Sequence, residues 1–412
     1  MFNPFFYQVN TRLTNTSEFP WKKNLYVIWT AQFIAMIGMN GCVPFLPLYI
    51  RELGVTDIAQ AKRWAGLVFA APFVLSFIMT PFWGYIGDKY GKKLMVVRAI
   101  MGLMLAMFLM GLAQNVWQLF ILRVIQGGIS GFIAANLSLV TAFTPKEHSG
   151  YAIAILQTST TSGIMVGPVV GGVFADTVGI RESFFLVTTL CFLSAIIVVF
   201  MVKEKKNGSP LPKEKKFVDH LNRVWQNKKL IQFFSFIALC QAGISFSTPI
   251  LAYYLEALHT PPNYLATITG LLIGSVGFLM TAFTPFWGRR NDRIGYEKNL
   301  LMALPIVAIV TIAQGFIFHY LYLFPLRFVI GIFSGAIVPT LYAALNKNCP
   351  PEMQGSIMGF ASSSAILGNL VGPLVGSFAA SSISMEAAFW LGGSMIAVVY
   401  FQVLRMDAKA DN

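Results

Sequence analysis

Charged residues are scarce in this chain of 412 amino acids. Asp, Glu, Lys and Arg make up 11% of it, whereas hydrophobic residues make up 56% and the mean hydropathy is +0.65. Soluble globular domains carry about a quarter charged residues. The composition therefore excludes a soluble enzyme, a disordered chain and a secreted disulfide scaffold. Because the apolar residues come in long blocks with few charges, we predict a polytopic membrane protein.

Cysteine and histidine are also scarce, with four residues of each. Cys42, Cys191 and Cys240 lie inside apolar runs, and neither they nor Cys349 have a CxxC or metal-ligand spacing. The histidines are isolated near loops, so no metal site is expected. A nucleotide-binding P-loop is absent, which leaves direct drive by ATP unsupported. Residues 1–20 lack the pattern of a cleavable signal peptide.

Twelve apolar segments are each long enough to cross a bilayer, which takes about 20 residues of helix. Their predicted limits are 25–50, 64–86, 95–113, 118–142, 151–176, 183–202, 230–255, 264–288, 299–318, 323–345, 355–379 and 387–404. Lys and Arg concentrate in cytoplasmic loops. With both termini cytoplasmic, 23 of the 30 basic residues lie in inner segments and four in outer loops. The net charge of +13 therefore needs no nucleic-acid partner.

The longest connection, residues 203–229, divides the spans into two sets of six. We expect an N-terminal six-helix bundle over 1–202, a cytoplasmic linker over 203–229 and a C-terminal six-helix bundle over 230–412. Within the linker, apolar residues at helical spacing between 217 and 225 predict a short helix on the membrane surface.

The two halves share an internal repeat. Residues 80–84 (TPFWG) return as 284–288 at an offset of 204, and the Gly-Pro pattern of 163–171 returns in 368–376 at an offset of 205. Two similar halves related by an axis along the membrane normal are typical of transporters that rock about a central site. The predicted fold is all-α, with 12 transmembrane helices in two pseudo-symmetric six-helix bundles.

The loop after the second span contains Gly84, Asp88, Lys89, Gly91 and Lys92. Glycines permit a tight turn between two helices, and Asp88 can accept backbone N–H bonds at a helix N-terminus. The alternative interpretation is an ordinary turn with cytoplasmic positive charge. The order of glycine, acid and basic cluster favours a specific role.

The fifth span contains Gly163, Gly167, Pro168, Gly171 and Gly172. Glycines four residues apart form a smooth face for close helix packing, and Pro168 bends the helix. A static packing seam and a moving interface both fit this pattern. The added proline and the copy in the eleventh span favour the moving interface.

Two arginines, Arg123 and Arg327, lie inside spans 4 and 10. A charged side chain within the bilayer is costly and usually functional. The alternative is that both side chains reach back to the outer interface. Gln126 follows Arg123 by three residues, whereas Ile330 takes that place after Arg327. This difference favours Arg123 as the functional arginine.

These residues resemble three signatures of the major facilitator superfamily, across essentially the whole chain. The loop after span 2 resembles its motif A, residues 123–127 (RVIQG) its motif B, and the Gly-Pro segment of span 5 its motif C, the antiporter signature. The three together favour the drug:proton antiporter branch. Residues 44–123 are particularly similar to MdtG-type multidrug exporters.

The resemblance implies an alternating-access exporter of drugs or small amphiphilic molecules in exchange for protons. It implies a bacterial inner-membrane protein, expected to be monomeric, that needs no cofactor beyond the proton gradient. Asp88 would lock a charge contact that rearranges during transport, and Arg123 would take part in proton coupling. The glycines of spans 5 and 11 would form the interface between the halves.

No acidic residue lies in the middle of a predicted span. The titrating group therefore stays open among Asp88, Glu52, Asp176 and Glu256. Because Arg123 and Arg327 are unbalanced in the spans, we expect neutral, zwitterionic or anionic molecules to be better substrates than lipophilic cations. The cavity should lie near the midplane. Its expected polar or adaptable residues are Gln32, Met36, Asn40, Asn136, Gln157, Thr161, Gln241, Ser245, Tyr342 and Asn369.

The repeat also aligns Arg51, at the outer end of span 1, with Glu256, at the outer end of span 7. We expect these charges to meet when the outside is closed, and two independently solvated charges are the alternative. Rival functions on the same fold are dedicated export of a metabolite such as a siderophore and, less favoured, uptake of sugars or organic acids. A membrane-embedded enzyme would need clustered acids, histidines or nucleophile–base pairs, and the sequence has none.

Overall fold

The computed structural model describes residues 21–129, 131–203, 227–347 and 354–410, and the regular elements in these ranges are all helices. The long helices are α1 (Trp21–Cys42), α3 (Ile58–Tyr90), α4 (Lys92–Gly111), α5 (Val116–Ile129), α6 (Phe132–Phe143), α7 (Ser149–Thr177), α8 (Ile180–Met201), α10 (Lys228–Ser245), α12 (Leu265–Ile294), α13 (Tyr296–Ala313), α14 (Leu323–Lys347), α15 (Gln354–Ser382) and α16 (Met385–Ala410). Short elements between them are η1 (Val43–Phe45), α2 (Leu46–Glu52), η2 (Lys146–His148), η3 (Thr248–Ile250), α11 (Leu251–Ala257), η4 (Pro262–Tyr264), η5 (Gln314–Phe316) and η6 (Tyr320–Tyr322).

The helices match the twelve predicted spans. Eleven stretches of the described chain are long and apolar enough to cross a membrane. The predicted span that is not among these eleven is the second, 64–86, which lies within α3, whose 33 residues extend about 50 Å at 1.5 Å per residue. The predicted surface helix of the linker lies outside the described residues.

Three of the predicted spans are broken rather than continuous. The first consists of α1, η1 and α2, with Pro44 and Pro47 at the break, and the seventh consists of α10, η3 and α11, with Pro249 at the break. Proline lacks the N–H that an α-helix needs at these positions. The fourth span is divided into α5 and α6 beside Gly131, which has a φ of +105°.

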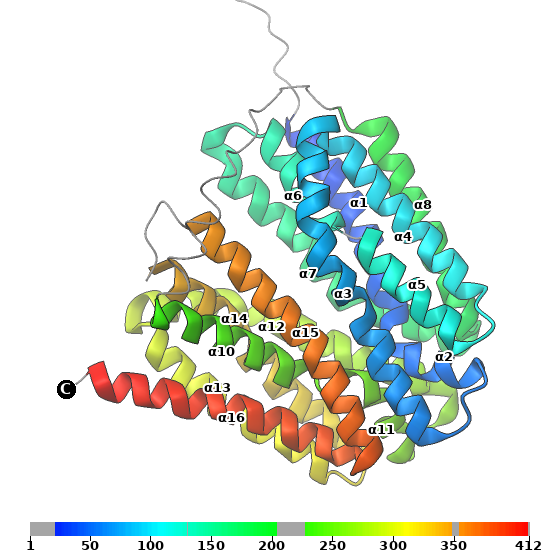
Figure 1. Ribbon diagram of the computed structural model, residues 1–412, viewed down its shortest axis with the longest axis vertical. Helices are drawn as coiled ribbons and strands as arrows, with labels where there is room; N and C mark the ends of the chain where they lie inside the picture. The colour runs from blue at the N-terminus through cyan, green and yellow to red at the C-terminus, as the bar shows by residue number, and fades with distance from the viewer. Residues whose placement is uncertain (1–20, 130, 204–226, 348–353, 411–412) are drawn as a thin grey trace, which may run out of the picture.

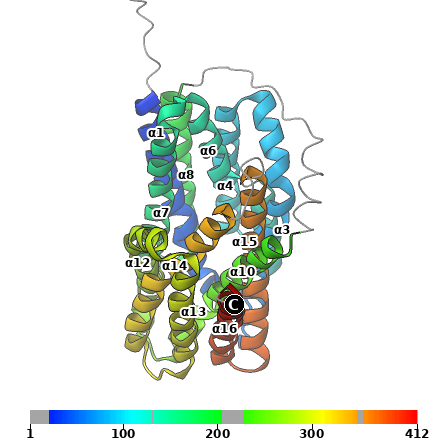
Figure 2. The same ribbon diagram turned by 90° about the vertical axis from the view of Figure 1, so that its left-hand side faces the viewer.

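The helices form two inclined sets, α1–α8 and α10–α16 (Figure 1). Two helix pairs join the sets: α7 packs against α12, and α3 packs against α15, as Figures 1 and 2 show from two sides. Both pairs meet at the end of the molecule that carries α2 and α11, which we call the outer end. The distribution of Lys and Arg over the loops predicts that this end faces away from the cytoplasm.

Hydrogen bonds repeat with the sequence. The Tyr49 hydroxyl donates to the Met110 carbonyl at 2.8 Å, and 205 residues later the Tyr254 hydroxyl donates to the Gln314 carbonyl at 2.7 Å. The Trp83 indole likewise donates to the Gly128 carbonyl, and Trp287 to that of Ile332, both at 2.7 Å. The two halves therefore share internal architecture as well as sequence landmarks.

The glycines of α7 serve two different interfaces, which corrects the expectation that all of them lie between the halves. A Cβ on Gly163 would lie 2.3 Å from the Cβ of Met36, and one on Gly171 would lie 2.0 Å from the Gly41 carbonyl oxygen. Both neighbours belong to α1, in the same half. The contact to α12 is made instead by the face of α7 that contains Gly172, where an added Cβ would lie 2.6 Å from the Ala266 carbonyl oxygen.

The rest of the pattern divides in the same way. Gly167 also faces α1, while the carbonyl of Pro168 faces Gly270 of α12. In the second half, the glycines of α15 at 368, 372 and 376 face α10, which is again within one half. The glycines spaced four residues apart therefore form a packing seam within one half. The face of α7 that contains Gly172 forms the interface between the halves.

Replacing Gly171 with alanine should destabilise the N-terminal half by about 1–3 kcal/mol, because the added methyl overpacks a contact between backbones. The measurement is the melting temperature of the purified protein in detergent. Gly150→Ala, on the same helix, is the matched control: a Cβ there meets no atom within 4 Å. An unchanged melting temperature in Gly171→Ala would contradict the packing described above.

Candidate functional site

A cavity of about 420 Å³ lies between the two halves. Its wall is formed by α1, η1, α3 and α5 on one side and by α10, η3 and α15 on the other. The apolar lining consists of Met39, Val43, Phe69, Pro72, Phe73, Gly127, Ile244 and Pro373, and the polar lining of Asn40, Ser76, Arg123, Gln126, Gln241, Ser245, Thr248 and Asn369. A mostly apolar pocket with a few fixed polar groups is the usual form of a site for small molecules.

Arg123 is the charged residue of this wall. It is 5% exposed, and its guanidinium is held by α3 and by its own helix: Nε donates to the Val68 carbonyl at 3.1 Å, and Nη1 donates to Gln126 Oε1 at 2.7 Å. The side chain therefore points into the protein, and the alternative that it reaches the outer interface is wrong. Gln126 fixes the orientation of the cation at the cavity.

Arg327, at the equivalent position of α14, is placed differently. It is 9% exposed and donates through Nη2 to Ser247 Oγ at 3.5 Å, while its Nε has no partner among the described residues. It is not part of the cavity wall. The difference between Gln126 and Ile330 thus coincides with a cavity-lining arginine in the first half and a buried, weakly bonded one in the second.

Four residues of the predicted cavity line it: Asn40, Gln241, Ser245 and Asn369. The Gln241 amide donates to Asn369 Oδ1 at 3.0 Å, which links α10 to α15. The second half thus contributes amide and hydroxyl groups to the cavity, whereas the first half contributes the cation.

The prediction is corrected for Gln32, Met36 and Asn136, which are each no more than 1% exposed. Gln32 accepts a hydrogen bond from Asn136 and donates to Thr160, so both amides are used between α1, α6 and α7. Gln32, Met36 and Asn40 do share one helical face. The glycines of α7 let that helix cover the first two, and only Asn40 reaches the cavity.

Gln157, Thr161 and Tyr342 are also absent from the cavity wall. Gln157 is exposed, and the Thr161 hydroxyl donates within its own helix to the Gln157 carbonyl. Tyr342 packs against the core of the second half.

The α3 part of the wall, which includes Phe69, Phe73 and Ser76, was not predicted. The recognisable motif of this helix lies at its C-terminal end, whereas these residues lie in its middle. A helical face with Phe69, Phe73 and Ser76 at spacings of four and three was the available signal.

At the outer end, the structure brings Arg51 and Glu256 together. Arg51 Nη1 lies 2.8 Å from Glu256 Oε1 and 2.6 Å from Oε2, and the two side chains are 41% and 46% exposed. Beside this pair, the Tyr253 hydroxyl donates to the Pro47 carbonyl. Both contacts join the first half to the second.

The prediction of a loop after span 2 is corrected: α3 continues through Gly84, Asp88 and Lys89 to Tyr90, so that only Gly91 separates it from α4. The surroundings of this motif are described only in part. The side chains of Asp88 and Lys89 and the surroundings of Gly84 lie outside the described residues. Gly91 separates α3 from α4 with a φ of +109°, a conformation that favours glycine. The expected tight turn is therefore present.

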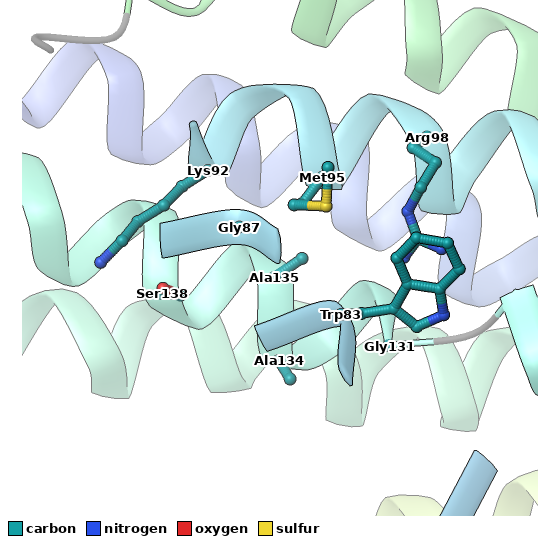
Figure 3. Close-up of a pocket in the computed structure, with 9 residues that line it drawn as sticks. All are labelled: Trp83, Gly87, Lys92, Met95, Arg98, Gly131, Ala134, Ala135 and Ser138. Atoms are coloured by element: carbon teal, nitrogen blue, oxygen red, sulfur yellow. The ribbon is translucent and has the colours of Figure 1, made fainter. Parts of the chain in front are cut away.

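A small cavity of about 60 Å³ adjoins this turn, and Lys92 is one of its lining residues (Figure 3). The Arg98 guanidinium lies 3.5 Å from the centre of the Trp83 ring, and Figure 3 shows these two side chains side by side. Such a cation–π contact contributes about 0.5–2 kcal/mol. It fixes α4 to α3 beside the turn, and the sequence does not predict it.

The three cysteines that the structure describes, Cys42, Cys191 and Cys240, are free and buried, as expected from their positions in apolar runs. Among the described residues, no three His, Cys, Asp or Glu side chains lie together as a metal-ligand set.

Comparison with known sequences identifies the relatives of this chain. The sequence profile of the Major Facilitator Superfamily matches residues 28–313 and 233–411. Multidrug resistance protein MdtG of Proteus mirabilis (strain HI4320) is 33% identical over 386 residues, which cover 93% of this chain and 95% of that protein. The protein of the same name from Salmonella typhimurium (strain LT2) is 33% identical over 380 residues, with 91% and 93% covered. The predicted resemblance to MdtG-type proteins is confirmed.

Solved structures confirm the predicted fold. The nucleoside transporter NupG has a TM-score of 0.78 at 12% identity, with 93% of this chain and 98% of that chain covered. A bacterial homologue of the human lysosomal transporter Spinster has a TM-score of 0.73 at 16% identity, with 95% and 98% covered. The protein is thus a multi-pass membrane transporter rather than an enzyme, and the chain belongs to the Major Facilitator Superfamily.

Proposed function

We propose that this protein exports drugs or other small amphiphilic molecules from the cytoplasm in exchange for protons, by alternating access. The observation that carries the proposal is the cavity of about 420 Å³ that both halves line and that contains Arg123. A site shared by two pseudo-symmetric halves is exposed to either side when the halves rock about it. The names of the MdtG relatives support drugs as the substrate class.

The conformation described here is, in this proposal, closed at the outer side. The inclination of the two helix sets and their contacts at the outer end support this assignment. The excess of Lys and Arg in the inner loops supports cytoplasmic termini, and the bacterial MdtG relatives support insertion in the bacterial inner membrane. The 1–202 and 230–412 bundles would move as the two bodies, with the 203–229 linker between them, in a monomeric transporter.

The chemistry of the cavity favours neutral, zwitterionic or anionic substrates. Among the described residues, its wall contains a guanidinium and several amides and hydroxyls but no carboxylate. In a site of low dielectric constant, the charge of Arg123 repels a cation and attracts an anion. Met39 and the α3 phenylalanines supply an apolar surface that adapts to different shapes.

Proton coupling is proposed through Arg123 and Asp88, as in the family motifs that these residues match. Arg123 is held by a carbonyl and an amide rather than by a carboxylate. Its charge is therefore available to respond to a bound substrate. Asp88 would lock the cytoplasmic closure in the opposite conformation.

The test is proton flux in proteoliposomes that hold a pH gradient, with a panel of lipophilic cations, neutral drugs, anionic drugs and siderophore-like metabolites. Neutral and anionic compounds should collapse the gradient, and Arg123→Gln should reduce the collapse to the rate of empty vesicles. Arg327→Gln, which removes an arginine outside the cavity, should retain most of the flux.

Several outcomes would contradict the proposal. Substrate accumulation without proton movement would exclude antiport, and strict selectivity for permanent cations would exclude the role of the Arg123 charge. Activity with siderophore-like compounds alone would show a dedicated metabolite exporter.

We also propose the Arg51–Glu256 pair as an outer gate contact. An ion pair that is nearly half exposed contributes about 1 kcal/mol or less. Arg51→Glu or Glu256→Arg alone should therefore lower the transport rate by up to about fivefold through like-charge repulsion. The double reversal should restore the rate. Failure of the double variant to recover, with all variants equally stable, would exclude the contact as a gate.

A further inference from the structure

Asp176 joins the two halves at the outer end by a contact between a side chain and a helix terminus. It stands in the last turn of α7, and its carboxylate accepts two backbone N–H bonds from the first turn of α12. Oδ1 accepts from Ala266 at 3.1 Å, and Oδ2 accepts from Thr267 at 2.6 Å. Both carboxylate oxygens of Asp176, a residue of the first half, thus accept hydrogen bonds from the backbone of the second half.

The first turn of α12 depends on this carboxylate. The first four N–H groups of a helix have no partner within it, and they carry partial positive charge that favours an anion. Helices usually satisfy these groups with a side chain at the N-cap, but Tyr264, at the N-cap of α12, makes no such bond. Asp176 therefore acts as the cap of α12, supplied from the opposite half.

The backbone geometry beside Asp176 makes this possible. One turn earlier on α7, Gly172 lets the backbone of α12 approach so closely that a Cβ would lie 2.6 Å from the Ala266 carbonyl oxygen. The nearest basic residue along the chain, Arg181, donates instead to the Ala113 carbonyl at 3.1 Å. The carboxylate of Asp176 is thus directed at the helix terminus and not at a neighbouring cation.

The pseudo-symmetric junction between α15 and α3 uses the opposite charge. The position equivalent to Asp176 is Ser381, and it accepts a hydrogen bond from Arg63 Nε at 3.2 Å. Lys62 Nζ donates to the Ala380 carbonyl at 3.3 Å. Here two cations of one half hold the C-terminal end of a helix of the other, where positive charge is favoured. Both junctions therefore pair a charged side chain with the complementary helix end.

We infer that Asp176 is a positioning residue of the transport cycle, which holds the outer side closed by capping α12 across the interface and must release it when the outer side opens. This inference rests on the proposed alternating access. Asp176, the charged side chain of the α7–α12 junction, lies outside the cavity and outside the three family motifs.

The test measures the distance between the halves directly, on purified protein without substrate or a proton gradient. Ile58 and Leu321 are 57% and 54% exposed and lie at the outer ends of opposite halves. Spin labels at these two positions, in a cysteine-free background, report the distribution of distances between the halves. Asp176→Asn keeps the size of the side chain but removes its charge. It should raise the ratio of long to short distances by about tenfold, because a hydrogen bond to a charged group is lost only in the closed state.

Two further variants separate this role from a general loss of structure. Asp176→Glu should restore most of the short distances, since it retains the carboxylate. Thr267→Pro removes one N–H donor in the first turn of α12, where proline is tolerated. It should shift the distribution in the same direction, and combining it with Asp176→Asn should add little.

Glu182→Gln is the matched control, because Glu182 is an exposed acid of the same outer end and should leave the distances unchanged. Distances in Asp176→Asn that match the parent protein, or an equal shift in Glu182→Gln, would overturn the inference. Since no transport is measured, failure of the drug–proton exchange proposal would appear in the flux assay alone. Failure of the inference that Asp176 holds the outer side closed would appear in these distances alone.

Discussion

Close approach of helix backbones at the outer end is the constraint on which the rest of the structure depends. Inside a bilayer, apolar side chains gain little by leaving lipid for protein, so helices associate through tight packing and polar contacts. Glycines on two faces of α7 meet this need twice, toward α1 within the first half and toward α12 in the second. The helix is thus built into one half while its other face closes against the opposite half.

This arrangement separates two kinds of polar group. Inside the first half, the buried amides of Gln32 and Asn136 bond to each other, and Gln32 also donates to Thr160 and to the Leu156 carbonyl, which ties α1 to α6 and α7. Between the halves, charged side chains at the outer end bond to helix termini or to each other, and the Tyr253 hydroxyl bonds to the Pro47 carbonyl. Such contacts together stabilise the closed state. They are also near enough to water to be exchanged for hydration when the halves separate.

Of the charged side chains that the structure describes, the one at the cavity wall, Arg123, belongs to the first half. Arg123 and Arg327 are equivalent in the repeat, yet Gln126 holds the former at the cavity wall while the latter lies outside it. The sequence repeat makes the two halves alike in fold, and the departures from it make them different in chemistry.

Much of this architecture could be predicted from the sequence, because the bilayer restricts spanning segments to long apolar helices and the repeat doubles each landmark. The same repeat aligned Arg51 with Glu256, and the two side chains are in contact. The sequence did not predict which residues of one helical face reach the cavity. Gln32 and Met36 are covered by a helix more than 120 residues away, and its approach depends on glycine contacts in three dimensions. The cap of α12 escaped prediction for the same reason, since its donor and acceptor belong to different halves.

The most direct test of alternating access is to lock the outer end and measure transport. Cysteines at positions 51 and 256, joined by a short reducible cross-linker, would hold together the two halves where Arg51 and Glu256 now meet. The account predicts that the cross-linked protein still binds substrate from the cytoplasmic side but does not export it, and that reduction restores export. Export at the normal rate with the cross-link intact would contradict movement of the two halves about the central cavity.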